Sequence, residues 1–229
     1  MFSVITSAMV ATPASLTGGY VGTSGFSYPS WRGGFYPEKA KPAEFLSFFS
    51  ERLPSVELNT TFYGLPAEEQ FRGWAAATPS EFRFAVKMSR RITHAGRLEL
   101  IPTFCEHVRL LGDRLGPVLV QFPPTRTRDD GLLRLLVDSL DPELEFAFEF
   151  RHESWAGAEV PLRINSFHGE APFRYFRLRE PPYDDKTLRD WARRFRPLLE
   201  QGTRLYCYFK HEDEPTAPLY AQRLLELLG

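Results

Sequence analysis

The sequence has few cysteines, almost no net charge and no long hydrophobic run. Its 229 residues include only Cys105 and Cys207, which are too few for a disulfide framework. The formal net charge of −1 gives no overall signal for nucleic acid or for an anionic membrane. No stretch approaches the roughly 20 apolar residues of a membrane span, and residues 1–18 lack the basic start of a signal peptide. We therefore expect a cytoplasmic protein that is not membrane-associated, with a flexible extension over residues 1–18.

Motifs for metals, nucleotide cofactors and nucleophilic serines are also missing. The sequence contains no HExxH or paired-cysteine spacing, no phosphate-binding or dinucleotide-binding glycine pattern, and no GxSxG elbow. Three of the five histidines, His94, His152 and His211, lie near the ends of predicted strands. They leave open a site assembled from scattered ligands, but no metal ligand set is predicted and the cofactor stays unknown.

Strand-like and helix-like segments alternate along the chain. The predicted strands are 19–26, 55–63, 82–88, 116–122, 144–151, 173–179 and 204–210, with a possible short strand at 161–167. Apolar stripes at helical spacing fill most of the gaps, the clearest being Leu188, Trp191, Phe195 and Leu199, where Pro197 predicts a kink or an early end. This alternation is typical of parallel βα units. We predict an α/β protein with a TIM-type barrel that forms a single domain over 19–229.

Polar residues recur at the carboxyl ends of the predicted strands, where βα barrels carry their functional residues. They are Glu57, Asn59, Lys87, His94, Gln121, Glu149, Arg151, Arg177, Arg179 and Lys210. A polar side chain within a hydrophobic strand costs several kcal/mol unless it is paired. The pattern therefore predicts a shared polar pocket, and the alternative is a cluster of ion pairs that fills the mouth of the barrel.

One segment is locally basic despite the balanced composition. Residues 81–97 contain Arg83, Lys87, Arg90, Arg91 and Arg97 against Glu81 alone. An excess of four positive charges in 17 residues fits either an anion site or a solvated loop and helix face. The residues alone leave both interpretations open.

Seven blocks at these strand ends resemble the YecE-like family, also called domain of unknown function 72. The blocks are 22–37, 56–66, 82–94, 115–124, 148–155, 175–185 and 206–218, and they occur in the same order as in the family. The resemblance implies a TIM-type barrel, reminiscent in fold alone of endonuclease IV and xylose isomerase. It also implies that Glu57, Asn59, Tyr63, Lys87, His94, Gln121, Glu149, Arg151 and Arg177 occupy motif positions. It implies no particular reaction.

The sequence departs from this family in one region. Family members usually have a further helix, strand and helix between the RHESW block and the YFRLR block, whereas only residues 153–174 stand there in this chain. We therefore expect the barrel to be incomplete or distorted around the sixth strand, which is either missing or reduced to 161–167. Such a barrel would expose strand edges.

Three functions are compatible with these observations. The first is binding of an anionic, phosphate-containing ligand, either a small molecule or a nucleic-acid segment, at the mouth of the barrel. Its predicted contacts are Trp31, Tyr36, Asn59, Tyr63, His94, Gln121, Arg151, Arg177 and Lys210. The sequence does not specify an oligomeric state.

The second function is a hydrolase or lyase that uses Glu57 and Glu149 as an acid–base pair, with Lys87 stabilising negative charge. This alternative requires the two carboxylates to lie within about 10 Å of each other. The third is a non-catalytic or degenerate interaction module, which requires a large apolar patch beside the shortened region.

Overall fold

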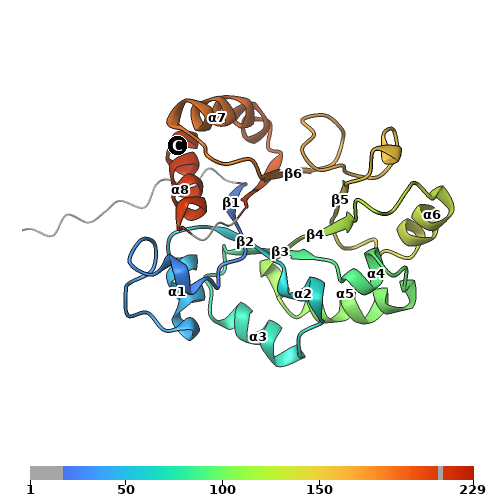
Figure 1. Cartoon of the computed structure of the whole chain (residues 1–229), viewed down its shortest axis with the longest axis horizontal. Coiled ribbons are helices and arrows are strands. Elements are labelled where there is room, and N and C mark those ends of the chain that lie inside the picture. The colour runs from blue at the N-terminus through green and yellow to red at the C-terminus, as the bar shows by residue number, and fades with distance from the viewer. Residues whose placement is uncertain (1–17, 211–213) are drawn as a thin grey trace, which may run out of the picture.

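Seven parallel strands form the centre of the molecule. The computed structural model describes residues 18–210 and 214–229. The strands are β1 (Gly19–Ser24), β2 (Ser55–Leu58), β3 (Arg83–Lys87), β4 (Leu115–Phe122), β5 (Phe146–Phe150), β6 (Phe173–Leu178) and β7 (Arg204–Phe209). They lie in the order β5-β4-β3-β2-β1-β7-β6. Figure 1 shows them at the centre with helices around them, so the predicted TIM-type barrel is confirmed, with one open seam between β5 and β6.

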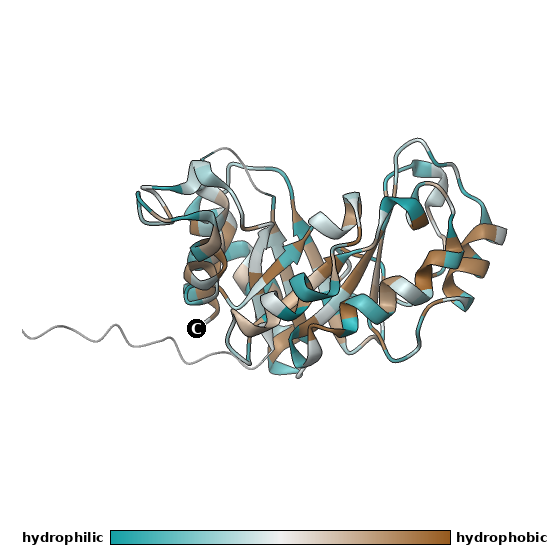
Figure 2. Ribbon diagram, turned by 90° about the horizontal axis from the view of Figure 1, so that it is seen from below, coloured by the Kyte–Doolittle hydropathy of each residue, from teal (hydrophilic) through white to brown (hydrophobic). Residues whose placement is uncertain are grey.

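Eight α-helices connect and surround the strands. They are α1 (Phe45–Ser50), α2 (Thr60–Tyr63), α3 (Glu68–Ala76), α4 (Arg90–Thr93), α5 (Ile101–Arg109), α6 (Asp130–Asp138), α7 (Asp185–Glu200) and α8 (Thr216–Leu228) among the described residues. Hydropathy colouring shows brown hydrophobic and teal hydrophilic residues on the same helices (Figure 2), as expected of helices with one buried face. Asp184 starts α7 as its N-cap, because its side chain accepts a hydrogen bond from the Thr187 amide over 2.7 Å.

Two local predictions were wrong. The strand expected over 55–63 ends at Leu58, and residues Thr60–Tyr63 form α2 instead. Thr61 holds this turn against the neighbouring strand, since its hydroxyl donates to the Lys87 carbonyl over 2.7 Å. Helix α7 also continues past Pro197 to Glu200, because Leu198 and Leu199 still pack into the core there.

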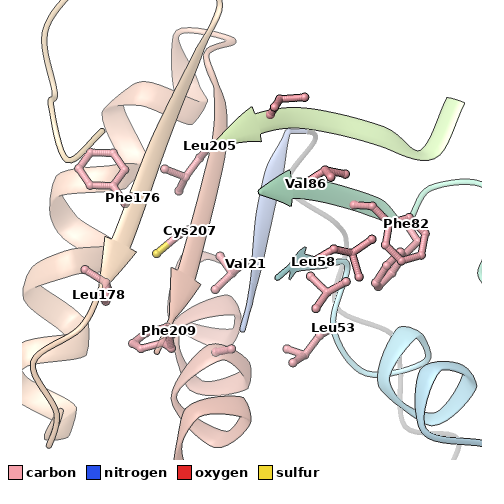
Figure 3. Close-up of a cluster of buried hydrophobic side chains, with 14 of the residues drawn as sticks. Val21, Leu53, Leu58, Phe82, Val86, Phe176, Leu178, Leu205, Cys207 and Phe209 are labelled. Carbon is pink, nitrogen blue, oxygen red and sulfur yellow. The ribbon is translucent and has the colours of Figure 1, made fainter. Parts of the chain in front are cut away.

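The apolar residues form two separate cores, one outside the strands and one inside the barrel. The larger core lies between the strands and the helices, and Figure 3 shows part of it, with Val21, Cys207 and Phe209 extending from neighbouring strands. The smaller core fills the barrel interior. Its buried members are Ala85, Leu119, Ala147, Leu162, Ile164, Phe173, Tyr175, Tyr206 and Tyr208. The lumen is therefore packed and not a channel.

The segment predicted as a reduced strand lies in the seam between β5 and β6. Phe148 of β5 donates its amide to the Leu162 carbonyl and accepts from the Ile164 amide, over 2.8 and 3.0 Å. On the other side, the Asn165 amide donates to the Tyr175 carbonyl of β6 over 2.8 Å. Residues 162–165 thus bond to both edges, and they pair with β5 through a single β-bridge, Phe148 with Arg163, instead of a full strand. No described helix lies between β5 and β6 other than a short 3-10 turn, and loops occupy that side in Figure 1.

Some predictions concern residues at or beyond the described ranges. Residues 1–17 of the expected extension lie outside the described residues, and only Gly18 is described. His211 also lies outside the described residues. That residues 19–229 form one domain stays a prediction. In the described part of the chain, no helix is both long and apolar enough to span a bilayer.

Candidate functional site

The carboxyl ends of the strands bring the predicted polar residues together at one mouth of the barrel. Glu57, Lys87, Gln121, Glu149 and Arg177 lie at or next to the last residue of β2 to β6. All five are at most 8% exposed. Inward-facing residues recur with period two, so these side chains lie one layer above the lumen residues two positions earlier. The five side chains therefore converge in one buried polar cluster, and that this cluster forms a ligand pocket stays a prediction.

Glu57 is held by four donors. Its Oε1 accepts hydrogen bonds from Ser24 Oγ over 2.9 Å, from Arg177 Nη2 over 2.9 Å and from Asn59 Nδ2 over 3.3 Å. Its Oε2 accepts from the Tyr175 hydroxyl over 2.7 Å. Complete burial by itself would raise the pKa of Glu57, but the Arg177 charge and the hydrogen bonds outweigh it and lower that pKa. Glu57 is thus a fixed carboxylate.

Arg177 links the two buried carboxylates. Its Nη1 donates to Glu149 Oε2 while its Nη2 bonds Glu57. The other oxygen of Glu149 accepts from Arg151 Nε over 2.9 Å, and the Arg151 side chain is one-third exposed. One guanidinium thus forms ion pairs with two buried carboxylates. The ion-pair interpretation therefore describes this part of the cluster.

Lys87 differs from these paired groups. Among the residues that the structure describes, its Nζ has no hydrogen bond or ion pair, and it lies 3.8 Å from the centre of the Phe62 ring. Burial, together with the positive charges of Arg177 and Arg151, lowers the pKa of Lys87 to about 8, although Glu57 and Glu149 oppose the shift. Lys87 is therefore a buried amine that is readily deprotonated.

Two further polar side chains border the cluster. Gln121 is 3% exposed, and its Nε2 is buried without a hydrogen-bond partner among the described residues. Arg179 is half-buried two residues after Arg177, and burial and the neighbouring charges of Arg177 and Arg151 lower its pKa. Both groups are donors that a ligand at the mouth could satisfy.

His94, Asn59, Tyr63 and Lys210 lie around the mouth. His94 packs edge-on against Phe62. Its pKa is lowered mainly by burial and, to a smaller extent, by the positive charges of Lys87 and Arg126. Asn59 and Tyr63 line a cavity of about 560 Å³ between the ends of β1 and β2 and the helices α1 and α3, and Tyr63 is 67% exposed. Lys210 follows β7 directly and its side chain is exposed.

Trp31 and Tyr36 are not placed to contact a ligand, which corrects the prediction made for them. Trp31 is completely buried and Tyr36 is 2% exposed. Tyr36 stacks on Phe45 of α1 with ring centres 4.4 Å apart, and its hydroxyl donates to the Phe26 carbonyl. Both rings therefore anchor the loop after β1 to the outer core.

The acid–base alternative fails at Glu57. The shared Arg177 guanidinium keeps Glu57 and Glu149 within about 10 Å, so the distance requirement is met. Glu57, however, is a fully buried carboxylate that accepts hydrogen bonds from four donors, and its lowered pKa disfavours uptake of a proton. Glu57 is better described as the partner that holds Arg177 in place.

The apolar patch required by the interaction-module alternative is missing from the described surface. The exposed large hydrophobic side chains in residues 18–210 and 214–229 are Tyr63, Leu65, Leu135 and Leu219. None of them belongs to residues 153–174. Phe167 instead packs against Phe176 and Phe195, with ring centres 4.7 and 5.9 Å apart, and so covers the side of the barrel next to the seam.

Sequence reasoning missed several residues that support the cluster. Ser24 and Tyr175 hold Glu57, and the Phe62 ring lies against the Lys87 amine. Period two could have indicated Tyr175, which lies two residues before Arg177. Phe62 could not be found in this way because it belongs to a helix. Within the described ranges, no group of three or more His, Cys, Asp or Glu side chains is arranged to hold a metal ion.

Comparisons with known proteins agree with the fold. UPF0759 protein YunF of Bacillus subtilis (strain 168) is 28% identical over an alignment of 149 residues that covers 59% of this chain and 51% of that protein. The chain thus spans about half the length of the curated relative it matches. A crystal structure of a DUF72 family protein from Thermotoga maritima MSB8 matches with a TM-score of 0.73 and 25% identity, covering 92% of this chain and 98% of that one. One from Enterococcus faecalis V583 matches with a TM-score of 0.71 and 19% identity, covering 92% and 97%.

The family model described as "Protein of unknown function DUF72" matches the chain in two parts, residues 20–167 and 159–229. The two parts overlap at 159–167, which includes the segment that lies in the seam of the barrel. The resemblance drawn from the seven sequence blocks is therefore confirmed. Because the first part alone covers more than half of the chain, this protein belongs to the DUF72 family.

Proposed function

We propose that this protein binds a phosphate-containing small molecule at the barrel mouth, with Lys87 as its central cation. The observation that carries the proposal is the unequal pairing of charges. Both buried carboxylates, Glu57 and Glu149, are bonded to Arg177, whereas Lys87 has no carboxylate partner among the described residues. A buried ammonium without a counter-ion is costly, and an anionic ligand removes that cost.

The charge balance at the mouth supports an anion. Lys87, Arg151, Arg177 and Arg179 face the two carboxylates Glu57 and Glu149, which leaves an excess of two positive charges when every group is ionised. Burial is the main cause of the lowered pKa of Lys87, and the positive charges of Arg177 and Arg151 add to it while Glu57 and Glu149 oppose it. An arriving phosphate would balance this excess of positive charge.

The depth of the site favours a small molecule over a nucleic-acid segment. Lys87 is only 8% exposed and Gln121 only 3%, so a ligand must insert a group into the mouth to reach them. Of the three aromatic residues among the predicted contacts, Trp31 and Tyr36 are buried in the outer core, which leaves Tyr63 alone to stack on a base. Tyr63 is exposed beside the mouth and could contact the rest of the ligand.

Thermal unfolding in the presence of inorganic phosphate, glycerol phosphate, nucleotides and short oligonucleotides tests the proposal. A ligand at 100 times its dissociation constant stabilises the fold by about 2.7 kcal/mol, which raises the Tm of a protein of this size by several degrees. We expect small phosphate esters to raise the Tm of the wild-type protein. Lys87→Met should weaken the affinity for them tenfold or more, whereas Lys186→Met, on the exposed face of α7, should leave it unchanged.

Two results would contradict this function. Equal shifts for wild type and Lys87→Met would place the anion elsewhere. A shift produced by oligonucleotides but by no small phosphate ester, and falling steeply between 50 and 200 mM salt, would identify the nucleic-acid alternative.

A further inference from the structure

Lys87 is unlike every other lysine in the chain. The sequence contains five lysines, and Lys39, Lys41, Lys186 and Lys210 are all exposed, whereas Lys87 is 8% exposed. Lysine is rarely buried unless its charge is paired. A strand-end lysine that is buried without an ion pair therefore indicates a chemical role for the amine.

The surroundings of Lys87 suit a neutral amine as well as a cation. On one side Nζ contacts the face of Phe62 of α2. On the other it faces the charges of Glu57 in β2, Glu149 and Arg151 at the end of β5, and Arg177 in β6, and His94 lies next to it after α4. Glu57 and Glu149 each form an ion pair with a guanidinium, and neither forms an ion pair with the Lys87 ammonium group.

The amine is consequently available as a nucleophile at mildly alkaline pH. With a pKa of about 8, set mainly by burial and by Arg177, roughly half of Lys87 is neutral at pH 8. An ordinary lysine with a pKa of about 10.4 is neutral to well below 1% at that pH. Only the neutral amine has the lone pair that attacks a carbonyl carbon.

We propose that Lys87 forms an imine with an aldehyde or ketone that also carries a phosphate group. The proposal rests on the proposed function, because Arg151 and Arg179 would hold the phosphate at the rim while the carbonyl group reaches Lys87. The Phe62 ring, whose centre lies 3.8 Å from Nζ, forms an apolar surface beside the reacting nitrogen. The site would therefore select anionic carbonyl compounds over simple phosphate esters.

The chemistry balances without any further reactant. The lone pair of neutral Nζ attacks the carbonyl carbon, and the carbonyl oxygen takes up a proton as the amine loses one, giving a carbinolamine. The hydroxyl group then leaves as water after protonation from solvent at the mouth, while the nitrogen lone pair forms the C=N bond. No electrons are gained or lost, and hydrolysis by one water molecule restores Lys87.

Pyridoxal 5′-phosphate is a suitable probe because it is an aldehyde that carries a phosphate. The wild-type protein is incubated with it at pH 8, reduced with borohydride and mapped by mass spectrometry after proteolysis. We expect labelling of Lys87 at least tenfold faster than labelling of Lys39, Lys41, Lys186 or Lys210. The labelling rate is expected to rise with pH with a midpoint near 8. Labelling of Lys87 no faster than the exposed lysines, or a midpoint near 10.5, would overturn the proposal.

Three controls separate this inference from the proposed function. Lys87→Arg keeps the cation but cannot form an imine, so it should retain the thermal shift with phosphate and lose the adduct. Slower labelling by pyridoxal, which lacks the phosphate, and protection by excess inorganic phosphate would support both proposals. Rapid labelling of Lys87 by pyridoxal with no effect of phosphate would support the imine and overturn the anion site. A phosphate shift that depends on Lys87, without any adduct at Lys87, would support the anion site and overturn the imine.

Discussion

Arg177 donates a hydrogen bond to Glu57 over 2.9 Å across the barrel, from β6 to β2, although the two residues are 120 positions apart in the sequence. Both side chains are almost completely inaccessible to solvent. Because Arg177 bonds Glu149 with its other terminal nitrogen, this single side chain ties together strands on the two sides of the open seam. The two ion pairs of Arg177 therefore also connect the strands of the barrel.

Replacement of Arg177 by methionine should strongly destabilise the fold. It would leave two buried carboxylates without their shared cation, and losing one partner of a buried ion pair costs about 3–5 kcal/mol. Urea denaturation measures the change. Arg189→Met is the matched control, since Arg189 pairs with Asp185 on the exposed face of α7 and should change little. A loss below about 1 kcal/mol for Arg177→Met would show that the cluster does not hold the barrel together.

Replacement of Lys87 by methionine should stabilise the protein at neutral pH. The folded state lowers the pKa of Lys87 from 10.5 to about 8, chiefly by burial, so between these values the unfolded chain binds more protons than the folded one. Stability then rises with pH across this window, and the penalty is fully present below pH 8. We expect Lys87→Met to gain about 1–3 kcal/mol at pH 7 and to lose this advantage near pH 10.5. Urea denaturation of both proteins from pH 7 to 10.5 tests this, and a variant that is less stable than wild type at pH 7 would show that the charge is well compensated.

Asn165 should stabilise the seam between β5 and β6. Its backbone has a φ of 57°, and its side-chain oxygen accepts a hydrogen bond from the Arg177 amide over 2.8 Å. Asn165→Ala loses this acceptor, and alanine adopts the left-handed region less readily than asparagine, whose polar side chain can hydrogen-bond locally, for a cost of about 1–2 kcal/mol. Hydrogen exchange at the Arg177 and Ile164 amides should accelerate. Asn165→Asp keeps the acceptor and serves as control, and equal exchange in all three proteins would refute a bracing role.

Both cysteines should be unreactive in the folded protein. Cys207 is completely buried and Cys105 is 4% exposed, and burial raises the pKa of each thiol. Ellman's reagent should detect no thiol under native conditions and two in concentrated urea. Immediate reaction of one thiol in the native state would mean that the outer core around it opens readily.

The sequence alone determined the parallel βα architecture and most of the cluster at the mouth. Apolar runs of strand length alternate with helical stripes, and a parallel sheet aligns the carboxyl ends of its strands at one edge. Polar residues at the ends of such runs, including Glu57, Lys87, Glu149 and Arg177, must therefore meet. The shortened region and its reduced strand could also be located, since no helical stripe occurs between residues 153 and 174.

Only the tertiary structure decided which of these residues are paired and which are available. Arg177 could have bonded one carboxylate or none, and the spacing along the chain does not distinguish Lys87 from its cationic neighbours. The burial of Trp31 and Tyr36 likewise depends on how the loop after β1 folds against α1. Local periodicity fixes the face on which a side chain lies, but ion pairing and desolvation depend on distances between strands that closure of the barrel sets.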